Sequence, residues 1–209
     1  MLDLLIGTFT VLLVVVDPIG VAALFAGLTR GGTAAYRRRM ALKGTVVAAV
    51  ILVAFAILGD ALFGYLGVGL PAFRIAGGAL LFLLAIDMVF ARHSGLRSTT
   101  LSEQAEAQSR ADISVFPLGI PLIAGPGAMT TVLLVVNSHR GDMAVLGALL
   151  AVIAAIMALT LVSLLFASQV MRILGETGAN VISRVLGVVL AALAIQFILD
   201  GLLATFGGR

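Results

Sequence analysis

Six apolar stretches, each long enough to cross a bilayer, constrain this chain more than any other feature. They run over residues 2–29, 44–66, 70–91, 113–136, 143–171 and 181–205. A membrane-spanning helix needs roughly 20 mostly apolar residues, and only helices and closed barrels satisfy all their backbone groups in lipid. The sequence therefore predicts an all-α membrane protein with six transmembrane helices in a lipid bilayer.

The composition excludes the other broad classes. Of the 209 residues, 61% are hydrophobic and 11% are charged, and the mean hydropathy is +1.21. A soluble domain is about one quarter charged. The net charge is +3, but the basic residues lie in short loops between apolar stretches, so we expect no nucleic-acid partner. The chain has no cysteine, its two histidines fall in loops, and no nucleotide-binding or nucleophile motif is present, so we expect no metal, no cofactor and no enzymatic activity.

The distribution of basic residues predicts the orientation. Nine of them share one side of the predicted topology, namely Arg30, Arg37, Arg38, Arg39, Lys43, Arg92, Arg97, Arg110 and Arg172. The opposite side carries Arg140 and Arg209. Because cytoplasmic loops are rich in Lys and Arg, we expect both termini to face away from the cytoplasm. The chain starts Met1-Leu2-Asp3, without the basic region of a signal peptide, so the first stretch is expected to be a retained helix.

The chain also repeats itself at a spacing of about 110 positions. Pro18 corresponds to Pro126, Arg74-Ile75-Ala76-Gly77 to Arg184-Val185-Leu186-Gly187, and Ala85-Ile86-Asp87 to Ala194-Ile195-Gln196. Three helices per half is an odd number, so the halves must enter the membrane in opposite directions. We therefore expect two inverted three-helix repeats, residues 1–91 and 113–209, joined by a polar cytoplasmic linker over 92–112, an organisation typical of secondary transporters.

The first and fourth stretches are predicted to be broken at mid-membrane. A straight helix over 2–29 would be about 42 Å long at 1.5 Å per residue, against a hydrocarbon core of roughly 30 Å. Proline and glycine interrupt it at Asp17-Pro18-Ile19-Gly20, and they interrupt the fourth at Pro117, Pro121 and Gly125-Pro126-Gly127. A half-helix that begins after a break offers free amides and a positive dipole end to an anion. The expected binding residues are Asp17, Pro18, Ile19, Gly20, Gly125, Pro126, Gly127, Thr130 and Thr131.

Two interpretations of Asp17 stay open. A carboxylate at a helix centre costs roughly 2.5–3.5 kcal/mol on insertion scales, so it needs a partner or a function. Asp17 could bind a substrate ammonium group, a cation or a proton, or it could only cap the half-helix that starts at Pro18. Thr130 and Thr131 could line the same cavity or bond to their own helix backbone.

The remaining intramembrane charges are expected to form ion pairs between helices. Asp60 and Arg74 lie near the outer ends of the second and third helices, and Asp87 and Arg184 near the inner ends of the third and sixth. Gln196 takes the place of Asp87 in the second repeat. We favour structural pairing over gating or proton relay. Small residues such as Gly77 and Gly78 permit close packing within the protomer or between protomers, which leaves a homo-oligomer open.

The run Phe116-Pro117-Leu118-Gly119-Ile120-Pro121-Leu122-Ile123-Ala124-Gly125-Pro126-Gly127-Ala128-Met129-Thr130-Thr131 resembles the signature of the MarC family of bacterial inner-membrane proteins. The segment from Asp17-Pro18-Ile19-Gly20 to Leu28-Thr29 resembles that family's first-helix motif, although the family usually has Asn at position 17. The resemblance covers essentially the whole chain. It implies a relation to transporters of small neutral amino acids such as glycine and alanine.

The leading hypothesis is a secondary transporter of a small zwitterion, such as a neutral amino acid. Backbone amides after Pro18 and Pro126 would hold its carboxylate, and Asp17 would receive the ammonium group or a coupling proton or sodium ion. The alternatives are an exporter or channel for another small solute, an intramembrane aspartyl hydrolase using Asp17 and Asp87, and a scaffold that transports nothing.

Overall fold

A computed structural model describes residues 2–90, 112–139 and 141–206, without the side chains at positions 60, 62, 63, 66 and 176. Most of the predicted 92–112 linker and three of its arginines lie outside these residues. The described part consists of the helices α1 (Leu2–Val16), α2 (Pro18–Leu28), α3 (Ala34–Leu66), α4 (Leu70–Phe90), η1 (Ser114–Ile123), α6 (Pro126–Ser138), α7 (Met143–Leu165) and α8 (Ala167–Phe206). It contains no strand, which confirms the all-helical prediction for these residues.

The helices are long and apolar enough to span a membrane. Five spans satisfy that test, and the first of them joins α1 and α2 into 27 residues. A sixth results if η1 and α6, which are bent by 58° at their junction, count as one span. The outward faces carry exposed apolar side chains such as Val50, Val162 and Leu203. A soluble protein rarely exposes apolar surface on this scale, whereas lipid covers it at no cost.

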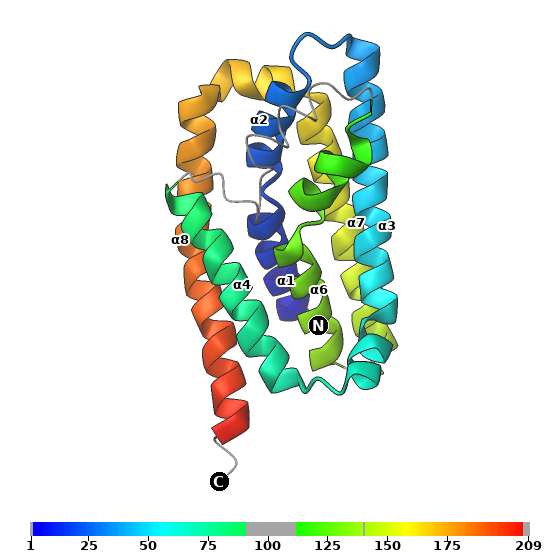
Figure 1. Cartoon of the computed structure of the whole chain (residues 1–209), viewed down its shortest axis with the longest axis vertical. Coiled ribbons are helices and arrows are strands. Elements are labelled where there is room, and N and C mark those ends of the chain that lie inside the picture. The colour runs from blue at the N-terminus through cyan, green and yellow to red at the C-terminus, as the bar shows by residue number, and fades with distance from the viewer. Residues whose placement is uncertain (1, 91–111, 140, 207–209) are drawn as a thin grey trace.

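Two predicted boundaries are wrong. The second helix begins at Ala34, ten positions before the apolar stretch, because Thr33 caps it by accepting a hydrogen bond from the Tyr36 amide (3.2 Å). Arginine is a good helix former, so the basic segment that was expected to be a loop forms the first turns of α3 instead. The fifth stretch is divided at Phe166, and α8 turns sharply at Gly175, whose φ of 64° suits glycine. The turns of α8 before Gly175 run across one end of the molecule (Figure 1).

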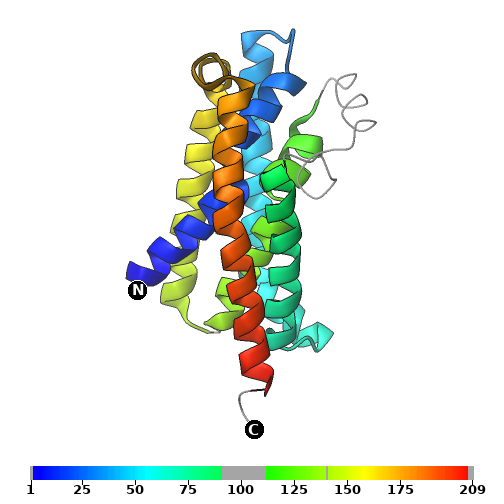
Figure 2. The same ribbon diagram turned by 90° about the vertical axis from the view of Figure 1, so that its left-hand side faces the viewer.

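The helices α4 and α8 pack side by side and antiparallel (Figures 1 and 2). A side chain at Gly78 of α4 would lie 2.7 Å from the Ala194 carbonyl oxygen of α8. A side chain at Gly201, further along α8, would lie 2.8 Å from the Pro71 carbonyl oxygen near the start of α4. Glycine at these positions lets the two backbones approach, and van der Waals packing of this kind drives helix association in lipid.

The α1–α2 and η1–α6 segments lie between the α4–α8 pair and the α3–α7 pair. The segment η1 packs on α3, and α6 packs on both α3 and α4. The helix α1 packs on α7, and α2 packs on both α7 and α8. The core therefore centres on the two interrupted segments, and its fully buried side chains include Leu12, Phe25, Leu81, Leu118 and Ile153.

Candidate functional site

The first interruption falls at Asp17, between α1 and α2. Asp17 has φ 45° and ψ 73°, the left-handed conformation that Asp and Asn tolerate best among non-glycine residues. Pro18 follows as the first residue of α2, where its missing N–H and fixed φ are favourable. The Asp17 Oδ1 accepts a hydrogen bond from the Gly20 amide (3.0 Å), so the side chain caps α2. Local sequence thus sets both the break and the cap.

The other carboxylate oxygen of Asp17 contacts a distant helix. Ser183 of α8 donates its hydroxyl to Asp17 Oδ2 at 2.6 Å, across 166 positions of sequence. Asp17 is fully buried, at 0% exposed. Sequence reasoning missed Ser183. The one available signal was a hydroxyl residue inside the last apolar stretch, directly before Arg184. The structure thus ties the first break to the final helix through a hydrogen bond from a partly buried serine to a buried carboxylate.

The second interruption lies between η1 and α6. The backbone of η1 leaves the helical region at Phe116 and Ile120, each directly before a proline. Such residues are pushed towards extended backbone by the proline that follows. The helix α6 then begins at Pro126, and its N-cap, Gly125, offers no side chain to the first amides. The two half-helices thus differ, because α2 is capped by a carboxylate and α6 is not.

The two interruptions lie close together. A side chain at Gly127, in the first turn of α6, would lie 2.9 Å from Val15 Cγ1 of α1 and 2.8 Å from Leu84 Cδ2 of α4. Figure 1 shows α2 and α6 leaving the middle of the molecule in opposite directions. Both half-helices therefore point their N-terminal ends, which carry the positive dipole charge, towards the molecular centre.

The two threonines after the second break have different surroundings. Thr130 is buried against α4, and a Cβ atom added at Gly77 of α4 would lie 2.4 Å from Thr130 Cγ2. Thr131 donates its hydroxyl to the Gly127 carbonyl of its own helix (2.9 Å). Thr131 also lines a cavity of about 400 Å³ between α1, α6 and α8, which the other predicted binding residues do not line. The Thr131 hydroxyl thus bonds to its own helix backbone, and a shared cavity with Asp17 stays a prediction.

The charged residues expected to pair between helices have these surroundings. Asp87 of α4 is buried (8% exposed) and Arg184 of α8 is exposed, and their pairing stays a prediction. Arg74 donates a hydrogen bond to Ser138 Oγ of α6 (3.0 Å). The Asp60 side chain lies outside the described part, so its pairing stays a prediction. Gln196 donates to Asp200 within α8 (2.7 Å).

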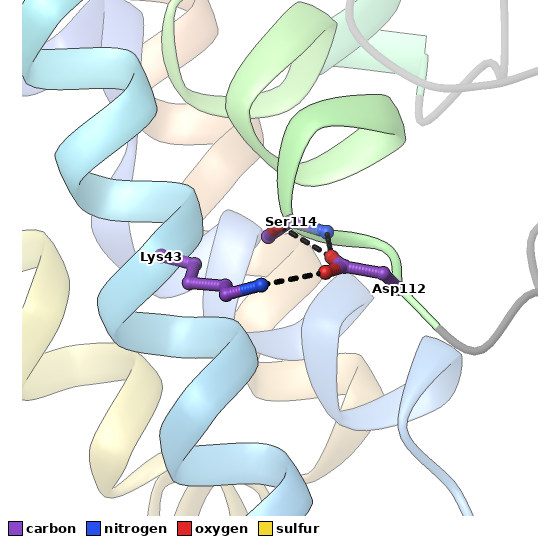
Figure 3. A network of polar contacts seen from close by, with 3 residues as sticks. All are labelled: Lys43, Asp112 and Ser114. Carbon is purple, nitrogen blue, oxygen red and sulfur yellow. Dashed lines mark hydrogen bonds and ion pairs between the residues drawn. The ribbon is translucent and has the colours of Figure 1, made fainter.

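A polar network that the sequence did not predict joins the two halves (Figure 3). Lys43 Nζ of α3 lies 2.8 Å from Asp112 Oδ2, directly before η1. Asp112 Oδ1 also accepts hydrogen bonds from the amide and the hydroxyl of Ser114. The hydrogen bond from Lys43 contributes most, and together these hydrogen bonds hold the pKa of the Asp112 carboxyl well below its usual range. Both charged side chains are partly exposed, so the pair fixes the start of η1 more than it adds stability.

The fold and these interruptions define a multi-pass, all-helical membrane protein with two interrupted helical segments at its centre. Comparison with known proteins identifies the group. The model of the MarC family integral membrane proteins matches residues 2–206, and the chain belongs to this family. The family resemblance seen in the sequence is thereby confirmed.

Similar proteins occur in distant organisms. The membrane protein YvbG of Bacillus subtilis is 36% identical over 206 residues, covering 99% of this chain and 97% of its own. A membrane protein of Archaeoglobus fulgidus is 35% identical, covering 96% and 93%, and YhcE of Escherichia coli is 34% identical, covering 96% and 92%. No solved structure matches the chain. The names of these relatives state a membrane protein without a substrate, so the relation to amino acid transporters is not supported by them.

Proposed function

We propose that this chain is a secondary transporter of a small zwitterionic solute, with neutral amino acids as the first candidates. The solute binds between the interrupted segments α1–α2 and η1–α6. The two halves, residues 1–91 and 113–209, act as inverted repeats in a bacterial inner membrane, with both termini in the periplasm. This proposal is for a carrier, not an enzyme.

The pattern of helix packing supports inverted repeats. Exchanging the halves turns three of the observed packings into three others: η1 on α3 becomes α1 on α7, α6 on α3 becomes α2 on α7, and α6 on α4 becomes α2 on α8. The close contacts of α4 with α8 follow the same exchange. Gly78 of α4 faces Ala194 and Ile198, and Gly187 of α8 faces Ala85 and Met88; Ala85 and Ala194 correspond to each other in the two repeats. A pseudo-twofold relation of this kind is common in transporters that alternate between two accessible states.

One observation carries the proposal: two half-helices begin at the centre of a membrane protein beside a buried carboxylate. The first turn of α6 has no side-chain cap, so its amides can receive a carboxylate. Asp17 supplies the opposite charge for an ammonium group or for a coupling proton or sodium ion. A zwitterion is the small solute whose carboxylate can bind the amides of α6 and whose ammonium group can bind Asp17.

The burial of Asp17 and its hydrogen bond with Ser183 suggest how access to the solute site is controlled. Asp17 is fully buried and Ser183 covers one of its oxygens, so α8 closes the site here. A cation that reaches Asp17 displaces the Ser183 hydroxyl. Binding and movement of α8 are thereby coupled through a single hydrogen bond, which is what a carrier needs to open on one side at a time.

An uptake screen tests the proposal. The purified protein is reconstituted into liposomes and offered labelled glycine, alanine, serine and threonine, with and without inward proton or sodium gradients. We expect saturable uptake of at least one solute that depends on a gradient. Non-saturable, gradient-independent flux would point to a channel, and cleavage of a membrane peptide without uptake to a hydrolase. Either outcome would refute the proposed carrier.

A further inference from the structure

The cavity between α1, α6 and α8 is large enough to hold a ligand. Its volume of about 400 Å³ lies within the range of roughly 300–1,000 Å³ typical of small-molecule sites. It is lined by Gly7 and Thr10 of α1, Thr131 of α6, and Leu193 and Phe197 of α8, with a few neighbours. It does not include Asp17 or the residues of the two interruptions, and Thr131 is the one predicted binding residue that lines it.

The lining of the cavity, which includes Thr8, Thr10 and Thr131, offers few polar partners to water. Thr10 donates its hydroxyl to the Ile6 carbonyl (2.8 Å), and Thr131 donates to the Gly127 carbonyl (2.9 Å). No charged side chain is among the described residues that line the cavity. A volume of this size corresponds to about 13 waters at roughly 30 Å³ each, and every buried water needs two to four polar partners. The walls favour an apolar occupant.

The mouth of the cavity opens onto the lipid-facing surface. Gly7 and Thr10 are exposed, and they lie inside the 27-residue apolar span Leu2–Leu28. Beside them the outward side chains are apolar, with Ile6 57% exposed on α1 and Leu199 47% exposed on α8. At this depth the surrounding medium is hydrocarbon. The most abundant molecule at the mouth is therefore a phospholipid acyl chain.

We propose that the cavity binds one acyl chain of a phospholipid from the surrounding bilayer, which enters laterally between α1 and α8. An acyl chain is apolar and flexible, so it fills an irregular space and restores the dispersion contacts that an empty cavity would lack. The bound chain holds α1 apart from α8 beside Thr131, one turn from the start of α6. This site does not depend on the proposed transport activity.

Gly7 offers a way to fill the cavity from within. A Cβ added at Gly7 meets no atom within 4 Å, and Gly7 lines the cavity, so Gly7→Leu adds an apolar side chain at the cavity wall. Gly27 of α2 is the matched control: it is also exposed in an apolar helix, its added side chain also meets nothing within 4 Å, and it is remote from the cavity. The two substitutions add the same apolar side chain to an exposed glycine.

Fluorescence quenching tests the proposal, because the chain has no tryptophan. Phe197→Trp places one indole in the cavity wall, and Leu193→Trp serves as a second reporter if the first variant does not fold. In liposomes of phosphatidylcholine brominated on its acyl chains, we expect the fluorescence to fall at least twofold relative to unbrominated lipid. Adding Gly7→Leu should restore at least half of the lost signal, whereas adding Gly27→Leu should restore none.

Two outcomes would overturn the proposal. Quenching that is unchanged by Gly7→Leu would mean that the indole meets lipid outside the cavity. Strong quenching by aqueous acrylamide, with little quenching by the brominated lipid, would mean that the cavity is filled with water.

Discussion

Replacing Asp17 by alanine should destabilise the protein through three separate losses. The cap on α2 contributes about 0.5–2 kcal/mol. A left-handed conformation costs an ordinary residue such as alanine about 1–2 kcal/mol. The hydrogen bond from Ser183 is worth about 0.6–1.7 kcal/mol by the measure of other membrane proteins. Removing a buried carboxylate also removes its desolvation cost. We therefore expect a net loss near the lower end of the sum, about 2–3 kcal/mol.

Asp17→Asn is the matched control. Asparagine caps a helix about as well as aspartate and tolerates the left-handed conformation, and its amide can donate to the Ser183 oxygen. We expect a loss below about 1 kcal/mol. The assay is reversible unfolding in mixed micelles, with Ser183→Ala and the double variant Asp17→Ala/Ser183→Ala completing a double-mutant cycle.

The double-mutant cycle also tests the interaction between Asp17 and Ser183 directly. If Asp17 and Ser183 interact as the structure shows, Ser183→Ala should cost less in the Asp17→Ala background than alone. Strictly additive losses would refute the buried contact. Equal losses for Asp17→Ala and Asp17→Asn would refute the role of the cap and point to the charge itself.

Three further predictions concern the packing, the polar network and the orientation. Gly78→Leu should destabilise the α4–α8 contact by about 1–3 kcal/mol in the same assay, because its side chain would meet the Ala194 carbonyl, whereas Gly27→Leu should be neutral. The pKa of Asp112 is lowered in the folded state, so its contribution to stability is present above the unfolded value of about 3.9 and is lost as the pH falls below it. The difference in melting temperature between the protein and Asp112→Asn should therefore shrink between about pH 6 and pH 3. A cysteine placed at position 3 of this cysteine-free chain should react with an impermeant reagent from the periplasmic side, and one at position 104 should not.

Much of the central architecture could be predicted because it depends on local chemistry. The helix starts at Pro18 and Pro126 follow from proline's fixed φ and missing donor, and the cap at Asp17 follows from its position directly before Pro18. Long apolar stretches likewise fixed the number of candidate spans. These features need no knowledge of which helices are neighbours.

The contacts between helices could not be predicted in the same way. The bond from Ser183 to Asp17 joins residues 166 positions apart, and the proximity of Gly127 to Val15 depends on how α6 sits against α1. Apolar residues surround almost every helix here, so the sequence does not show which face of a helix turns inward. For that reason the sequence alone does not show whether Asp87 and Arg184 face each other.

The extension of α3 to Ala34 had a different cause. The first turns of α3 are basic, and a basic segment beside an apolar stretch is typical of a loop. Arginine is nevertheless a good helix former, and Thr33 provides the cap. The length of an apolar stretch predicts the membrane-embedded part of a helix but not where the whole helix begins and ends.

The most direct measurement of the central claim is solute uptake by a variant that narrows the space between the two interruptions. In Gly127→Ala the new methyl group meets Leu84 Cδ2 at 2.8 Å, Val15 Cγ1 at 2.9 Å and Leu81 Cδ2 at 3.1 Å, so it reduces the space beside the first turn of α6. Gly27→Ala, whose methyl group meets nothing within 4 Å, is the control. In liposomes at equal protein content and matched melting temperature, uptake of the solute found in the screen should fall at least fivefold for Gly127→Ala and stay unchanged for Gly27→Ala. Full uptake by folded Gly127→Ala would contradict a transport path between α2 and α6.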